Sequence, residues 1–154
     1  MAYEGVGREI VARLKYRNAR CVVPWLAAEM ATLVGGPASD GTIDVVVPVP
    51  TTAARRRERG FDQGRVLAVA VARRLGLPCR ALLRRRSGPS QTGRPRLQRL
   101  EGPAFDVRGR GPVPPHVLLV DDVVTTGATL TAAARALGAA GAREVRVVAA
   151  ARRA

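Results

Sequence analysis

The chain has 154 residues, enough for one domain with a sizeable buried core and no need of disulfide support. Its two cysteines, Cys21 and Cys79, lie far apart in the sequence and indicate neither a C-x-x-C metal motif nor a disulfide framework. No apolar run reaches the roughly 18 residues of a membrane span. We therefore expect a single cytoplasmic domain over residues 1–154, without membrane insertion and without zinc.

The net charge is strongly positive. Twenty-six basic residues stand against 12 acidic ones, a formal charge of +14, which makes polyanions the obvious partners. Sixteen arginines and only four acids fall within residues 55–110. However, 25 of the basic residues are Arg on an Ala-rich background, a bias that a GC-rich genome imposes without functional selection, so both explanations stay open. The scarcity of aromatic residues argues against a base-stacking platform.

The first 40 residues predict two helices. Residues 3–20 carry an apolar side chain at every fourth position, the pattern of a helix that packs along one face. A second helix is expected over residues 25–34, opened by Pro24. We expect Trp25 in the core or in a helix-to-helix contact.

The middle of the chain alternates strand and helix patterns. Residues 43–49 are β-branched and nearly all apolar, which predicts a central strand with Pro48 and Pro50 at its exit. A basic loop then leads into a helix with apolar residues at one-turn spacing, ended by Gly76.

A second strand is expected over residues 79–83, and a short one over residues 104–107. Between them, Gly and Pro repeatedly break residues 84–103, which predicts a long mobile loop.

The most informative stretch is residues 116–130. Four apolar residues form a buried strand, and Asp121 and Asp122 close it. Because two acids are costly to bury unpaired, we expect them to face a cleft that binds something polar. The following threonines, a glycine and a helical pattern predict an anion site at a helix N-terminus. The alternative is that the acids cap a helix and the threonines close a turn. The lone histidine, His116, is expected at the opposite end of the strand in a structural or solvent-facing role.

Strands that alternate with helices predict a parallel sheet with its ligand site outside the carboxyl ends of the strands. We expect the loops after Pro50 and after Val120 to converge there. Neither an internal repeat nor a second domain is evident.

Residues 117–130 resemble the phosphoribosyl pyrophosphate (PRPP) binding motif of type I phosphoribosyltransferases, with four apolar residues, two acids and a T-G-x-T loop. The resemblance implies that Asp121 and Asp122 contact the ribose and act in catalysis. It also implies that the loop holds the 5′-phosphate. The loop residues are Thr125, Thr126, Gly127, Ala128 and Thr129.

Other segments are similar to the ComF family of competence-associated phosphoribosyltransferase-like proteins. They are Pro48-Val49-Pro50, Arg57-x-Arg59-Gly60-Phe61-Asp62-Gln63, Ser90-Gln91-Thr92-Gly93 and Ala104-Phe105. The similarity implies an α/β, type I phosphoribosyltransferase fold: a central, mostly parallel sheet with helices on both faces, an N-terminal helical segment and a mobile Arg-rich loop. Two features depart from the family. Residues 1–154 hold no cysteine-rich zinc-binding segment of the kind that often begins its members, either because this lineage has lost it or because it lies before Met1, and Leu100 stands where an Asn is expected.

By position in these motifs, a second set of residues is implied to bind the pyrophosphate of PRPP. Backbone N–H groups and guanidinium groups both suit phosphate oxygens. The set is Thr51, Thr52, Arg55, Arg56 and Arg59. In the mobile loop, Gln91, Arg94 and Arg96 are candidates to close over the ligand and exclude water. For each arginine taken singly, solvated surface is an equal alternative.

The implied activity is binding of PRPP, or of a related ribose phosphate, with Mg²⁺ carried by the pyrophosphate rather than by a protein cage. Transfer of the phosphoribosyl group to a nitrogen acceptor is the implied reaction, and the sequence identifies no acceptor. The family name implies a role in DNA uptake, with single-stranded DNA or the uptake machinery as candidate partners. Non-catalytic nucleic-acid binding, PRPP-sensing regulation and the oligomeric state stay open.

Overall fold

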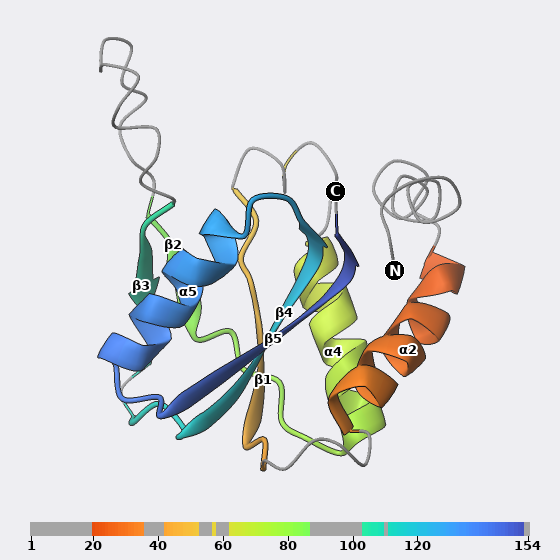
Figure 1. Ribbon diagram of the computed structural model, residues 1–154, viewed down its shortest axis with the longest axis horizontal. Helices are drawn as coiled ribbons and strands as arrows, with labels where there is room; N and C mark the ends of the chain where they lie inside the picture. The colour runs from red at the N-terminus through yellow and green to blue at the C-terminus, as the bar shows by residue number, and fades with distance from the viewer. Residues whose placement is uncertain are drawn as a thin grey trace, which may run out of the picture.

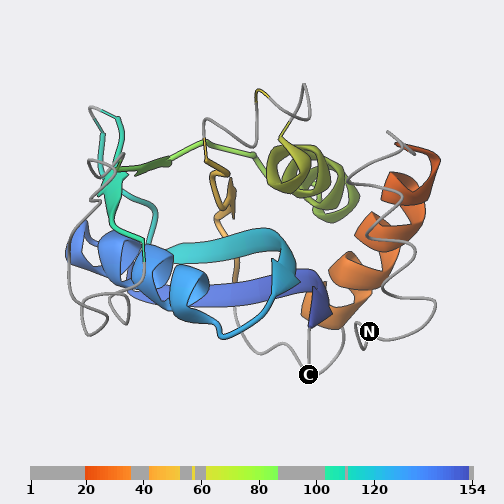
Figure 2. The ribbon, with the colours of Figure 1, turned by 90° about the horizontal axis from the view of Figure 1, so that it is seen from above.

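The computed structural model describes residues 20–35, 42–52, 57, 62–86, 103–109 and 111–152. Three parallel strands form its central sheet in the order β1-β4-β5. They are β1 (Val45–Pro48), β4 (His116–Val124) and β5 (Glu144–Arg152). Figures 1 and 2 show helices α2 and α4 on one side of this sheet, and helix α5 with the β2-β3 hairpin on the other.

The helices form where the sequence pattern predicts them. A 3₁₀ turn, η1 (Arg20–Val22), leads into α2 (Val23–Gly35). Helix α4 (Gln63–Leu75) ends at Gly76, whose φ of 66° lies in the left-handed region that glycine adopts without strain. Helix α5 (Ala128–Ala139) follows β4.

Two apolar cores explain why β1 and β4 are hydrophobic on both faces. On one face, Leu26 of α2 and Leu67 of α4 pack in a cluster with Val46 and Leu118. On the other face, the cluster includes Leu137 of α5 and alternate residues of the same strands. A strand covered on both sides needs no polar alternation. The predicted α/β fold, with a central parallel sheet and helices on both faces, is confirmed.

Two expectations about the strands are wrong in their boundaries. Residues 79–83 do not form a strand: Cys79 makes a single parallel bridge to Val46, and the chain then leaves the sheet. It enters β2 (Leu83–Arg85), which pairs antiparallel with β3 (Phe105–Val107). The first residues of the expected 84–103 loop therefore belong to a strand, because β3 supplies their hydrogen-bonding partners.

Trp25 is not a core residue, since 48% of it is exposed. Helix α2 buries the stripe formed by Val23, Leu26, Ala27 and Met30. At a helical spacing of about 100° per residue, Trp25 falls outside this stripe.

Most of two further predictions, the helix over residues 3–20 and the loop over residues 84–103, falls outside the described residues. Within the described part of the chain, no helix is both long enough and apolar enough to cross a membrane.

Candidate functional site

Strands β1 and β4 direct the two predicted loops to one edge of the sheet. Their last paired residues are Pro48 and Val120, and the N–H of Val49 donates to the Val120 carbonyl at 2.9 Å. Because the strands are parallel, the loop after Pro50 and the residues after Val120 leave from the same edge. The structure thus brings the two predicted halves of the site to neighbouring positions.

The acid pair does not close β4 as the sequence suggested. Strand β4 continues to Val124 because β5 pairs with it as far as Arg152, whereas the pairing with β1 stops at Val120. Asp121 and Asp122 therefore lie where β4 has lost one of its two neighbours. Both are partly exposed, and Oδ1 of Asp121 accepts a hydrogen bond from the N–H of Asp122 at 2.8 Å. Two carboxylates so placed can accept hydrogen bonds from ligand hydroxyl groups.

The loop after β4 leaves the start of α5 open. Gly127 is the N-cap, has a φ of 77° and provides no side-chain cap. Thr125 and Thr126 are exposed, and Oγ1 of Thr126 accepts only a long contact, 3.4 Å, from the N–H of Ala128.

Within the described residues, no hydrogen bond reaches the N–H groups of Thr129 and Leu130. Free N–H groups and the positive end of the helix dipole together favour an anion there. The role of this loop in holding a 5′-phosphate stays a prediction.

The exit of β1 is tied to the start of α4 through Asp62. Oδ1 of Asp62 caps the helix by accepting from the N–H of Arg65 at 3.1 Å. Its Oδ2 is the acceptor for the N–H of Thr51 at 3.5 Å. A Cβ atom added to Gly64 would lie 2.9 Å from the carbonyl oxygen of Val49, so helix and loop approach closely.

Asp62 is part of the motif named above, but the sequence alone assigned it no role at this edge. The sequence could have indicated the capping role of Asp62, because Asp directly before a helical pattern is a favoured N-cap. Its contact directs the Thr51 N–H toward a carboxylate, whereas we expected the Thr51 N–H to face a diphosphate. The diphosphate role of Thr51 and Thr52, both half-buried, stays a prediction.

The arginines proposed for the ligand, Arg55, Arg56, Arg59, Arg94 and Arg96, lie outside the described residues, as does Gln91. Their roles stay predictions.

Arginines in the described hairpin are partly used within the protein. Nη2 of Arg84, in β2, lies 3.0 Å from Oδ2 of Asp106. Nε of Arg86, the residue after β2, lies 2.6 Å from Oδ1 of the same carboxylate. The hydrogen bond from Arg86, followed by that from Arg84, lowers the pKa of the Asp106 carboxyl. The Arg85 guanidinium lies 5.9 Å from the centre of the Phe105 ring. Part of the arginine excess thus stabilises the hairpin.

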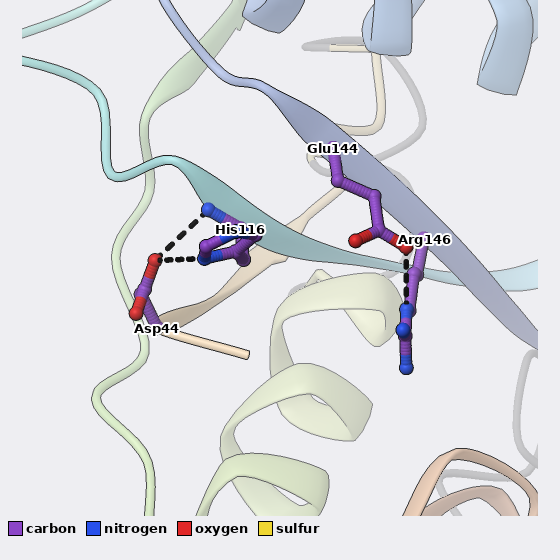
Figure 3. A network of polar contacts seen from close by, with 4 residues as sticks. All are labelled: Asp44, His116, Glu144 and Arg146. Atoms are coloured by element: carbon purple, nitrogen blue, oxygen red, sulfur yellow. Dashed lines mark hydrogen bonds and ion pairs between the residues drawn. The ribbon is translucent and has the colours of Figure 1, made fainter. Parts of the chain in front are cut away.

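His116 lies at the opposite edge of the sheet, as expected. Asp44 accepts from the N–H of His116 at 2.9 Å and contacts its Nδ1 at 3.0 Å (Figure 3). Nearby, Arg146 binds Glu144 at 2.7 Å, and this hydrogen bond lowers the pKa of Glu144. The Asp44 contact joins the start of β4 to the residue before β1, whereas the Arg146 contact lies within β5.

Comparison with known proteins agrees with this geometry. The family model of the phosphoribosyl transferase domain matches residues 61–154. The chain belongs to the phosphoribosyl transferase domain family.

Among curated relatives of this phosphoribosyltransferase-like chain is competence protein ComFC of Bacillus subtilis (strain 168), 29% identical over 136 residues. The match covers 88% of this chain and 55% of the relative. Competence protein ComFC of Streptococcus pneumoniae (strain ATCC BAA-255 / R6) is 33% identical over 102 residues, 65% of this chain and 44% of the relative. The chain therefore spans about half the length of these relatives. The resemblance to the ComF family is confirmed.

Solved structures show the same fold. The allosteric regulatory enzyme of purine biosynthesis superposes with a TM-score of 0.54 at 22% identity, over 83% of this chain and 25% of the other. Purine phosphoribosyltransferase from Pyrococcus horikoshii Ot3 superposes with a TM-score of 0.52 at 20% identity, over 81% of this chain and 72% of the other. At these identities the likeness shows the fold alone.

The fold family implies Mg²⁺, and the donors at the site fit it in a limited way. Asp121 and Asp122 offer carboxylate oxygens, the ligands that Mg²⁺ prefers. No group of three His, Cys, Asp or Glu side chains that could hold a metal occurs among the described residues. The donor set thus suits an ion held mainly by ligand phosphates and water, with one or two carboxylates in support.

Proposed function

We propose that this phosphoribosyltransferase-like chain is a cytoplasmic protein that binds PRPP with Mg²⁺ at the edge where β1 and β4 end. The observation that carries the proposal is the open N-terminus of α5 behind Gly127, which directly follows the pair Asp121 and Asp122. A helix N-terminus suited to a phosphate and two carboxylates suited to hydroxyl groups, on one continuous segment, match the phosphate and the ribose of a ribose 5-phosphate.

Each part of the site has a separate task. The N–H groups at the start of α5 and the hydroxyls of Thr125 and Thr126 bind the 5′-phosphate. Asp121 and Asp122 accept hydrogen bonds from the ribose hydroxyls. Thr51 and Thr52, with the arginines that follow them, bind the pyrophosphate. Mg²⁺ neutralises pyrophosphate charge when bound.

The chemistry that these groups support is displacement at C1 of the ribose. The bond from C1 to the pyrophosphate oxygen breaks, pyrophosphate leaves with the electron pair, and an acceptor nitrogen supplies the pair for the new C1–N bond. Positive charge develops on the ribose ring, and the carboxylates of Asp121 and Asp122 stabilise it electrostatically. The proposal covers the donor half of the reaction and assigns no acceptor.

Calorimetry with PRPP and Mg²⁺ tests the binding. Asp122→Asn combined with Thr126→Ala removes one charge and one hydroxyl from the site. Hydrogen bonds to charged groups are worth about 1.5–3 kcal/mol each, and about 1.4 kcal/mol corresponds to a tenfold change in affinity, so we expect a loss of about 100-fold or more. Thr131→Ala, on the exposed side of α5, is the matched control. Absence of heat with the unmodified chain would refute the proposal.

Turnover is tested separately from binding. A panel of purines, pyrimidines and amines, scored for pyrophosphate release, distinguishes a transferase from a protein that uses PRPP as a signal. Release with one acceptor class and not with the others identifies the reaction. Binding without release on the whole panel supports the sensing role.

The names of the relatives extend the proposal to natural competence, with DNA uptake as the process served. A second candidate function, binding of single-stranded DNA, is favoured by the exposed arginine side chains of the hairpin, 56% for Arg84 and 64% for Arg86. Binding through phosphates must weaken steeply as salt rises. Affinity at low salt no better than that of a neutral control protein would exclude this function.

A further inference from the structure

A groove lies between α2 and α4, on the side of these helices that the sheet does not cover. Its volume is about 400 Å³, within the range of about 300–1,000 Å³ of ligand-binding pockets. Val23 and Pro24 form the α2 wall, and Val66, Val69 and Ala70 form the α4 wall. Figures 1 and 2 show the two helices side by side. The groove is distinct from the edge that carries Asp121 and Asp122.

Two arginines of α4, Arg65 and Arg73, complete the lining of this groove. They stand eight residues apart on one helix, about 12 Å along its axis at 1.5 Å per residue. Both are exposed, and neither forms an ion pair within the described part of the chain. Among the residues that the structure describes, no acidic side chain lines the groove. An apolar floor is thus bordered by two cations that the described residues do not neutralise.

We propose that this groove binds an amphipathic helix of a partner protein, with an apolar stripe and an acidic residue near each end of the stripe. Helices bind in apolar grooves through side chains at i, i+3, i+4 and i+7. Acids seven residues apart on such a helix are about 10.5 Å apart along its axis, close to the separation of the two arginines. Charge complementarity of this kind selects the partner and its orientation. The net charge of +14 further favours an acidic partner.

The test uses the full chain and three labelled synthetic peptides of 16 residues. The first peptide has leucines at i, i+3, i+4 and i+7 and glutamates at i+1 and i+8, which are seven residues apart. The second replaces the glutamates by lysines, and the third is a scramble of the first. Fluorescence anisotropy measures each affinity. We expect the acidic peptide to bind the unmodified chain at least tenfold more tightly than either control peptide.

Variants of the groove locate the binding. Val69→Asp should weaken the acidic peptide at least tenfold, and Leu33→Asp, on an exposed position of α2 that does not line the groove, is its control. Arg65→Glu with Arg73→Glu should reverse the preference toward the lysine peptide. Glutamate at position 65 lies in the first turn of α4, where the helix dipole favours an acid. Arg135→Glu on α5, on the other face of the sheet, controls for net charge.

The following results would overturn the proposal. They are equal binding of the scrambled peptide, an unchanged affinity of Val69→Asp, an unreversed peptide preference in the double arginine variant, a loss in Arg135→Glu as large as in that variant, and a change of oligomeric state in Val69→Asp by sedimentation. The last would assign the groove to a second copy of this chain. Tighter peptide binding by Ile10→Asp would assign it to the N-terminal stretch of the same chain. If Val69→Asp does not fold, the charge reversal decides alone.

Discussion

Gly64→Ala tests whether the close approach of α4 to the exit of β1 sets the geometry of the ligand edge. The new Cβ would lie 2.9 Å from the carbonyl oxygen of Val49, a backbone atom that cannot rotate away. Either the first turn of α4 or the loop after β1 must shift. Thr51, two residues beyond Val49 and bound to Asp62, would shift with the loop.

The expected magnitude follows from two opposing terms. Ala in place of Gly stabilises a helix interior by up to about 1 kcal/mol, whereas overpacking in a well-packed region costs about 1–3 kcal/mol. Gly138→Ala is the matched control, because Gly138 lies near the end of α5 and its added Cβ meets nothing within 4 Å. The propensity term is similar in both variants, so their difference in unfolding free energy isolates the steric term, about 1–3 kcal/mol.

Urea unfolding of both variants measures this difference, and calorimetry with PRPP and Mg²⁺ measures its effect on the site. We expect Gly138→Ala to be at least as stable as the unmodified chain and to bind PRPP unchanged. Gly64→Ala should be less stable than this control and should bind more weakly. Equal stability of the two variants would show that the contact between α4 and Val49 is relaxed in solution, and the reasoning would fail.

Three further predictions concern other contacts. Asp44→Ala should lower the free energy of unfolding in urea by about 1–3 kcal/mol, because Asp44 accepts two hydrogen bonds from His116 worth about 0.5–1.5 kcal/mol each. His116→Ala keeps the backbone bond and should lower it by less, and a larger loss in His116→Ala would contradict this. Iodoacetamide should modify exposed Cys21 faster than Cys79, whose pKa is raised by burial against a smaller opposing effect of Arg65, as mass spectrometry at pH 8 can show. The pKa of Asp106 is lowered, so its ion pairs stabilise the hairpin at pH values above the ordinary Asp pKa of about 3.9. This stabilisation is lost as the pH falls through the folded-state pKa. An NMR titration of Asp106 with a midpoint at or above the ordinary pKa would refute this.

The parts of the fold that could be predicted are those with strong local patterns. Residues 43–49 are nearly all apolar and contain β1, and the apolar run over residues 117–120 forms part of β4. Helix α4 was predicted with its end at Gly76 because the glycine and the apolar spacing agree. The prediction of a strand over residues 79–83 was wrong, because only Cys79 pairs with the central sheet, through Val46, and Leu83 already belongs to the hairpin with β3. Whether such a segment forms a strand depends on pairing partners that are distant in sequence, and a local pattern carries no information about those partners.

The candidate site divides in the same way. The segment from Asp121 to Thr129 is continuous, so its order of acids, glycine and hydroxyls could be read directly from the sequence. The contact between Asp62 and Thr51 joins residues eleven positions apart and depends on how α4 approaches β1. The groove of Arg65 and Arg73 needs a second helix as its other wall. Spacing along one helix could have suggested the arginine pair but not the wall opposite it.

Helix α4 connects these features, because one of its ends contacts the ligand edge and its outer face lines the groove. Its first turn is capped by Asp62, and the same carboxylate contacts the loop where pyrophosphate is proposed to bind. Arg65, one turn further, lines the groove. A partner helix that pairs with Arg65 would therefore act on the residue whose N–H holds Asp62 in place. Linkage requires that any effect of the partner on PRPP affinity be matched by an equal effect of PRPP on partner affinity. Measuring the acidic peptide with and without PRPP and Mg²⁺ would reveal this coupling as a difference between two dissociation constants, and equal constants would mean that the groove and the ligand edge are independent.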